Sequence, residues 1–254
     1  SSYENDIRAL MMAFFPGEKI VLNGEDTDYQ VRVIFLPDKV KISLEDGEQT
    51  LSFKEGMCDF SDYREAKNTL KRILYDCLAS YKQVSLPWGT LTGIRPTKIA
   101  MDLINRGFSQ EEMYDYFKRE YYLSDEKYSL CSRVAQNESR ILKDLDYGST
   151  YSLYVGIPFC PTICAYCSFS SFPLSAWKKR VDDYLEALFK ELDYLASLPD
   201  EKHLLTLYMG GGTPTSLTAS QMDRLLDKLS SIYDFSSIRE ITIEAGRPDS
   251  ITMD

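Results

Sequence analysis

The pattern of apolar and polar positions divides the chain into two parts with different periods. Between residues 31 and 53 apolar residues alternate with polar ones, and turn sequences at Pro37-Asp38 and Asp46-Gly47 interrupt the alternation. Such alternation is typical of strands with one buried face, so this stretch predicts an antiparallel meander. Residues 19–24 predict a further short strand before it.

Helical spacing replaces the alternation in the next stretch. Apolar residues recur every three or four positions over 70–81, which predicts a long helix that covers one face of the sheet. Three more helices are expected: one over 96–107, one after Ser109 with a Ser-x-x-Glu capping box, and one after Ser124. Residues 1–150 are therefore predicted to form an α+β domain.

From Tyr151 onward strands and helices alternate. Apolar strands are predicted at 151–157, 204–209 and 241–243, and amphipathic helices at 177–195 and 218–229. Strands joined by helices of this length form parallel βαβ units, so the second part is predicted to be α/β, with the boundary at 147–150. Three such units are too few to close a barrel, so residues 151–254 are expected to be truncated after the third strand.

Composition and charge narrow the classes of function. The 254 residues are 44% hydrophobic and 27% charged, and the formal charge of −10 at pH 7 disfavours nonspecific binding to nucleic acid or to anionic membranes. No apolar run approaches the ~20 residues that a membrane span needs, and the first residues lack a signal-peptide pattern. A cytoplasmic protein with neither nucleic acid nor membrane as a partner is expected.

Three cysteines are the strongest chemical signal. Cys160, Cys164 and Cys167 follow the first strand of the second part with the spacing C-x₃-C-x₂-C. Three thiolates on one loop can hold three irons of a [4Fe–4S] cluster and leave the fourth iron open to an exchangeable ligand. The alternative is a structural zinc site, but its natural fourth ligand, His203, is predicted at the opposite end of the second strand.

Two further motifs follow the next two strands. A glycine-rich turn, Gly210-Gly211-Gly212-Thr213, ends the second strand, and Glu244 ends the third. Because the carboxyl ends of parallel strands meet at one edge, both should face the cysteine loop. Glycines let a backbone approach a ligand closely, and a carboxylate accepts hydrogen bonds from hydroxyl or ammonium groups. Each feature alone is typical of an ordinary turn or surface, and the shared edge favours a ligand site.

Together these motifs resemble the radical S-adenosylmethionine superfamily. Within it they are similar to the oxygen-independent coproporphyrinogen III dehydrogenase group. The motifs that carry this similarity are Tyr154-Val155-Gly156-Ile157-Pro158-Phe159-Cys160, the cysteine loop, Gly210-Gly211-Gly212-Thr213-Pro214-Thr215 and Ile241-Thr242-Ile243-Glu244-Ala245. An upstream segment, Leu91-Thr92-Gly93-Ile94-Arg95-Pro96-Thr97-Lys98, is similar to the HemZ-type branch. The resemblance implies that residues 151–254 form the N-terminal part of a radical-SAM (β/α) partial barrel.

The resemblance also implies roles for the motif residues. Cys160, Cys164 and Cys167 would ligate a [4Fe–4S] cluster, and S-adenosylmethionine would bind its open iron. The cofactor would be contacted by residues before, within and opposite the cysteine loop: Tyr154, Tyr166, Gly211, Gly212, Thr213 and Glu244. An electron from a donor such as flavodoxin or ferredoxin would release a 5′-deoxyadenosyl radical, which would start the oxidative decarboxylation of coproporphyrinogen III propionates to vinyl groups in heme biosynthesis.

Two departures from the group keep a second function open. Phe169 stands where the dehydrogenases carry a further cysteine, and Gly156 stands where they usually have histidine. Heme-trafficking proteins of the superfamily also lack that cysteine, so a heme-binding chaperone on the same scaffold is the alternative. In either case the 254 residues alone are expected to bind a cluster poorly and to turn over little, because the remaining strands would shield the radical.

Overall fold

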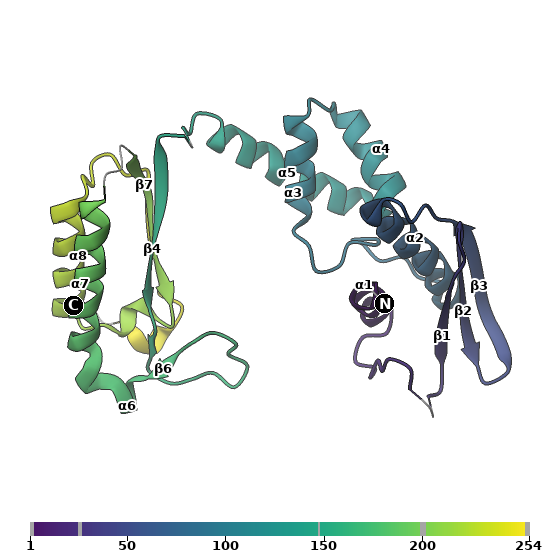
Figure 1. Ribbon diagram of the computed structural model, residues 1–254, viewed down its shortest axis with the longest axis horizontal. Helices are drawn as coiled ribbons and strands as arrows, with labels where there is room; N and C mark the ends of the chain where they lie inside the picture. Colours follow the sequence, from purple (N-terminus) through teal and green to yellow (C-terminus); the bar gives the residue numbers. More distant parts are fainter. Residues whose placement is uncertain (1–2, 25–26, 147, 199–201, 252–254) are drawn as a thin grey trace. The chain divides into compact units, whose positions relative to one another are not determined.

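The computed structural model describes residues 3–24, 27–146, 148–198 and 202–251 (Figure 1). The chain divides into two compact units, residues 1–144 and 145–254. Helices and strands occur in both units and the second contains a parallel sheet, so the fold is mixed α/β. Of the predicted boundary, Tyr147 lies outside the described residues. Within the described residues no helix is both long and apolar enough to cross a membrane.

An antiparallel sheet of order β1-β2-β3 and a set of helices make up the first unit. The bounds are α1 (Glu4–Phe14), β1 (Gln30–Phe35), β2 (Lys39–Asp46), β3 (Gln49–Met57), α2 (Tyr63–Lys82), α3 (Pro96–Asn105), α4 (Gln110–Tyr121) and α5 (Asp125–Leu142). The predicted meander is confirmed. In β2 every second side chain is buried, as the alternation requires.

Helix α2 covers one face of this sheet, as predicted (Figure 1). Its apolar stripe packs on the sheet, and Leu74 and Leu78 belong to the same buried cluster as Ile42 of β2. The helix begins where the Asp62 carboxylate accepts hydrogen bonds from two backbone amides of the first turn. It ends at Lys82, and the next residue, Gln83, has a left-handed φ of 54° that stops the helix.

Helices α3, α4 and α5 share a separate core. Met113 and Phe117 of α4 are fully buried and belong to one cluster with Leu103 of α3 and Ala135 of α5. The predicted capping box is present at Ser109, where the side chain and Glu112 exchange hydrogen bonds with each other's backbone.

Two expectations for the first unit need correction. Residues 19–24 do not form a strand, because Asn23 turns the chain with a φ of 51° and the segment pairs with no described strand. Helix α1 was not predicted from the sequence. It is held by two apolar side chains, Leu10 and Phe14, that are buried against the core of the unit.

The second unit contains a parallel sheet of order β4-β7-β8. Its elements are β4 (Thr150–Ile157), β5 (Phe159–Cys160), β6 (Phe172–Pro173), α6 (Leu174–Trp177), η1 (Lys178–Arg180), α7 (Val181–Ser197), β7 (His203–Gly211), η2 (Pro214–Ser216), α8 (Ala219–Ile232), β8 (Glu240–Ile243) and η3 (Pro248–Ser250). The parallel pairing is confirmed. The helix predicted from Trp177 is instead broken into α6, η1 and α7, because the chain changes to a 3₁₀ turn at 178–180.

Helices α7 and α8 lie on the same side of β4 and β7 (Figure 1). Leu185 and Leu225 pack with Val155 and Leu207, so this face of the sheet is the core of the unit. Side chains of the opposite parity point away from the helices, and Tyr154 is 59% exposed. One face of the sheet is therefore open, and its carboxyl end carries the predicted motifs.

Candidate functional site

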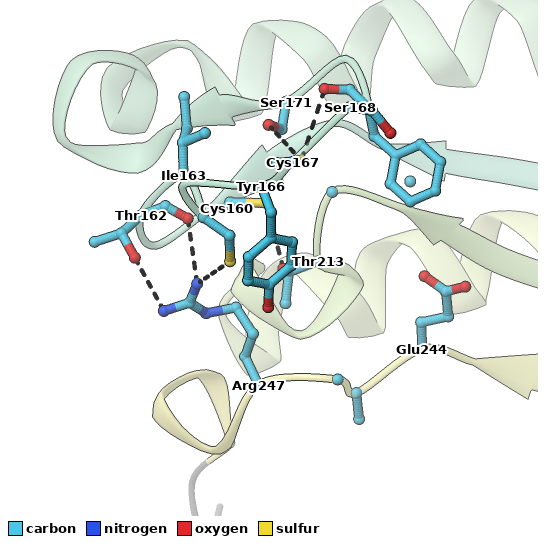
Figure 2. Close-up of a pocket in the computed structure, with 16 residues that line it drawn as sticks. Cys160, Thr162, Ile163, Tyr166, Cys167, Ser168, Ser171, Thr213, Glu244 and Arg247 are labelled. Atoms are coloured by element: carbon cyan, nitrogen blue, oxygen red, sulfur yellow. Dashed lines mark hydrogen bonds between the residues drawn. The ribbon is translucent and has the colours of Figure 1, made fainter. Parts of the chain in front are cut away.

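A pocket of about 730 Å³ lies at the carboxyl end of the parallel sheet (Figure 2). Its walls come from the loop after β4, the turn after β7 and the segment after β8. They are formed by Cys160, Thr162, Ile163, Cys164, Tyr166, Cys167, Ser168, Phe169, Ser171, Gly211, Gly212, Thr213, Glu244, Ala245, Gly246 and Arg247. Of the predicted residues, Tyr154 is absent from this set; the other eight are part of it.

The three cysteines differ in exposure. Cys160 lies in β5 and is buried, Cys164 is half-buried, and Cys167 is exposed. The Cys160 Sγ is 3.4 Å from the Thr213 Oγ1, and the Cys167 Sγ is 3.8 Å from the Ser171 Oγ. Among the described residues no three His, Cys, Asp or Glu side chains are placed to hold one metal ion. Shared ligation would therefore require the thiols to converge.

The glycine turn is bonded to the start of the cysteine loop. The Gly212 amide donates to the Ile157 carbonyl and the Thr213 amide to the Phe159 carbonyl, both at 2.8 Å. A Cβ on Gly212 would lie 2.7 Å from the Phe159 carbonyl oxygen and 3.0 Å from the Cys160 Sγ. Gly211 has a φ of 113°, which L side chains rarely adopt. Glycine is therefore required at this turn for the close approach of two backbones.

Glu244 is held by a tyrosine that the sequence did not single out. The Tyr208 hydroxyl donates to the Glu244 Oε1 at 2.6 Å, and this hydrogen bond raises the pKa of Tyr208. The Tyr208 ring stacks with that of Tyr154 at a centroid distance of 5.7 Å. A Cβ on Gly210 would lie 2.8 Å from the Tyr154 hydroxyl, so both rings extend over a glycine toward the pocket end of the sheet. Parity along β7 could have revealed Tyr208, because it is two residues before Gly210.

Arg247 is a second residue that sequence reasoning missed. Its guanidinium donates to the Thr162 carbonyl, the Thr162 hydroxyl and the Cys164 Sγ (Figure 2). It also forms an ion pair with Asp249. Asp249 raises the pKa of Arg247, and Arg247 lowers the pKa of Asp249, so both remain charged at neutral pH. The pocket therefore has a fixed cation beside a thiol.

The donor set of this pocket fits an iron–sulfur cluster. Three thiols that line one pocket match the protein ligands of a cluster with one open iron, and the backbone of Gly211 and Gly212 lines the same pocket. The alternative zinc site has less support, because His203 begins β7 at its amino end. Tyr166 is 89% exposed on the pocket rim, where its ring is free to cover a bound molecule.

The chain is similar to proteins of heme and porphyrin metabolism. It is 37% identical over 209 residues to the oxygen-independent coproporphyrinogen-III oxidase-like protein HemZ of Bacillus subtilis, a match that covers 81% of this chain and 42% of that protein. It is 37% identical to the heme chaperone HemW of the same species, over 40% of this chain and 26% of the chaperone. It is 38% identical to the oxygen-independent coproporphyrinogen III oxidase of Escherichia coli, over 41% of this chain and 22% of the oxidase.

A solved structure, described as coproporphyrinogen III oxidase (HemN) from Escherichia coli and as a radical SAM enzyme, matches 37% of this chain and 22% of that chain, with 34% identity and a TM-score of 0.34. No family model matches the chain. The chain spans less than half the length of each of these three curated relatives.

Proposed function

We propose that the pocket binds a [4Fe–4S] cluster and S-adenosylmethionine. The similarity to the oxygen-independent coproporphyrinogen-III oxidase-like protein HemZ supports this assignment. The protein that contains these residues then carries out the oxygen-independent oxidative decarboxylation of coproporphyrinogen III propionates to vinyl groups. The observation that carries the proposal is that Cys160, Cys164 and Cys167 line one pocket together with the Gly211-Gly212 turn.

The proposal assigns a task to each group of residues. The three thiolates ligate the cluster, and the glycine turn with Thr213 accepts the methionyl part of the cofactor at close range. The Glu244 carboxylate accepts hydrogen bonds from its ribose or its amino group, and the Tyr166 ring covers its adenine. Tyr154 supports the site indirectly, through its stacking on Tyr208.

The chemistry supplied by the bound cofactors is a carbon radical that removes a hydrogen atom from the substrate side chain. The chain's own residues bind, orient and exclude water. The buried Thr213 and Cys160 close the base of the pocket, and the covered face of the sheet keeps solvent from it on that side. The electron comes from a small redox protein such as flavodoxin or ferredoxin.

In this proposal residues 151–254 are the N-terminal part of a radical-SAM (β/α) partial barrel, and residues 1–150 are a separate domain with no assigned role. The open edge of the sheet at β8 is where a further strand of such a barrel would add. Turnover by the 254 residues alone is expected to be low, because further strands of the barrel would be needed to shield the radical from solvent.

A heme chaperone is the second candidate. Phe169 lines the pocket and is 76% exposed, so it offers an apolar ring where the dehydrogenases carry a cysteine. The similarity to HemW supports the same alternative. In this case the protein would bind heme in stoichiometric amounts and pass it to an acceptor, without converting coproporphyrinogen III.

Anaerobic reconstitution of the whole protein with iron and sulfide tests the proposal. The wild type should bind iron and inorganic sulfide in equal amounts and cleave S-adenosylmethionine when reduced, whereas Cys164→Ala should lose both properties. Cys131→Ala is the matched control, because this thiol is buried among helices α3 to α5 and outside the pocket. Product analysis with coproporphyrinogen III, and separately with heme, distinguishes the two functions. Tightly held zinc without sulfide would contradict both.

A further inference from the structure

Arg247 connects two walls of the pocket. It follows β8, yet its guanidinium bonds with residues of the loop after β4, more than eighty positions earlier in the chain (Figure 2). The Nη1 donates to the Thr162 carbonyl at 3.3 Å, and the Nη2 donates to the Thr162 Oγ1 at 3.0 Å. Because Thr162 lies between Cys160 and Cys164, these bonds fix the middle of the first ligand spacing.

The same guanidinium is in contact with a cysteine sulfur. The Arg247 Nη1 is 3.5 Å from the Cys164 Sγ, and the side chain of Arg247 is only 24% exposed. Water therefore screens this cation less than it screens a fully exposed side chain.

Asp249 sets the direction in which Arg247 points. Its two carboxylate oxygens accept from the Nε and Nη2 at 2.9 Å and 2.6 Å, which is a bidentate pair. Arg247 and Asp249 are only two positions apart, so this ion pair orients the guanidinium without support from another element. Asp249 also offsets part of the positive charge.

We propose that Arg247 is a positioning residue that fixes the cysteine loop and places a permanent positive charge beside the cluster, which makes the cluster easier to reduce. This inference rests on the proposed cluster site. Each added electron makes the cluster more negative, so a nearby cation stabilises the reduced form and raises the reduction potential. Hydrogen bonds to the ligand sulfurs act in the same direction.

Potentiometric titration of the reconstituted protein, followed by electron paramagnetic resonance, tests the charge. Arg247→Met should shift the midpoint potential to a more negative value, and Asp249→Asn should shift it to a more positive value because the cation loses its counter-charge. Arg247→Lys should retain most of the wild-type potential. Arg224→Met is the control, since Arg224 pairs with Asp182 and Glu186 between helices α7 and α8 and away from the pocket.

Hydrogen exchange of the metal-free protein tests the positioning role separately. Arg247→Met should accelerate exchange over residues 160–167 several-fold, and Arg247→Lys should do the same in part, because an ammonium group cannot reproduce the fork of bonds to Thr162. Arg224→Met should leave this segment unchanged.

The outcomes separate this inference from the proposed function. A wild-type protein that assembles no cluster would contradict both. If the cluster assembles normally and its midpoint potential is equal in the wild type, Arg247→Met and Asp249→Asn, the proposed role of Arg247 is wrong and the proposed function stands. Shifts of opposite sign in the last two variants are expected only from an electrostatic effect, because a purely structural defect has no reason to reverse its sign.

Discussion

Gly212 lies where the glycine turn touches the cysteine loop, and the Phe159 carbonyl and the Cys160 Sγ leave no space for a side chain there. We predict that Gly212→Ala destabilises the second unit by about 1–3 kcal/mol, because the new methyl group would overlap the Phe159 carbonyl. It should also reduce cluster content, since the Cys160 Sγ would be displaced. Chemical denaturation and iron analysis measure the two effects.

Gly246 provides the control for that experiment. It lines the same pocket, but a Cβ there would meet no atom within 4 Å. Gly246→Ala should therefore leave the free energy of unfolding and the iron content close to wild type. Equal losses in the two variants would show that any side chain in the pocket is harmful, rather than the close contact at Gly212.

Tyr208 is predicted to act through Glu244. Tyr208→Phe keeps the ring and its stacking on Tyr154 but removes the hydrogen bond to the Glu244 carboxylate. With the carboxylate no longer oriented, S-adenosylmethionine should bind about tenfold more weakly, as expected for the loss of about 1.4 kcal/mol. Equilibrium binding to the reconstituted protein measures this.

Tyr194→Phe is the matched control, because this exposed tyrosine lies on α7. Unchanged affinity in Tyr208→Phe would contradict the proposed role of Glu244 in cofactor binding.

At the scale of single residues, the sequence identified the site residues that belong to a recognisable motif. It missed the site residues whose role depends on which face of a strand they occupy or on where the chain runs afterwards. The cysteines, the glycines and Glu244 are visible because their types and spacings are unusual. Tyr208 and Arg247 are ordinary residue types, and their importance comes from the parity of β7 and from the path of the chain after β8. Parity along β7 could point to Tyr208, but its bond to Glu244 and the contacts of Arg247 with the cysteine loop are visible only in the arrangement in space.

Secondary-structure elements begin where the sequence provides a cap. We predict that Ser109→Ala lowers the free energy of unfolding of the first unit by about 1 kcal/mol, because the Glu112 amide loses its acceptor and the first turn of α4 is left unsatisfied. Ser85→Ala, at an exposed position outside any helix, should have little effect. Urea denaturation followed by circular dichroism compares them, and equal stability of the two variants would contradict the role of the cap.

Elements with strong local signals were predicted closely, and those that depend on distant partners were not. Capping boxes, formed by Ser109 with Glu112 and by Thr218 with Gln221, mark the starts of α4 and α8 in the sequence itself. The segment 19–24 has apolar residues suited to a strand, but no described strand accepts its backbone bonds. The two-residue pairing of β5 with β6 follows from the path of the cysteine loop and is too short to have a period.

At the scale of the whole molecule, each unit has its own cores. Leu74 belongs to a cluster in the first unit and Leu185 to a cluster in the second, and both side chains are fully buried. Leu74→Ala and Leu185→Ala should each cost about 2–5 kcal/mol through a cavity and the loss of apolar burial. Hydrogen exchange should show the loss of protection only in the unit that carries the change. Loss of protection across both units would contradict independent cores.

The exposure of the three cysteines increases along their loop, from a buried Cys160 to an exposed Cys167. An alkylating reagent added to the metal-free protein should therefore label Cys167 first, then Cys164, and reach Cys160 only after the base of the pocket opens. Damage by air would follow the same order. Cys167 is thus the thiol that is damaged first when the metal-free protein is stored. The protein should lose its capacity to take up a cluster long before it unfolds.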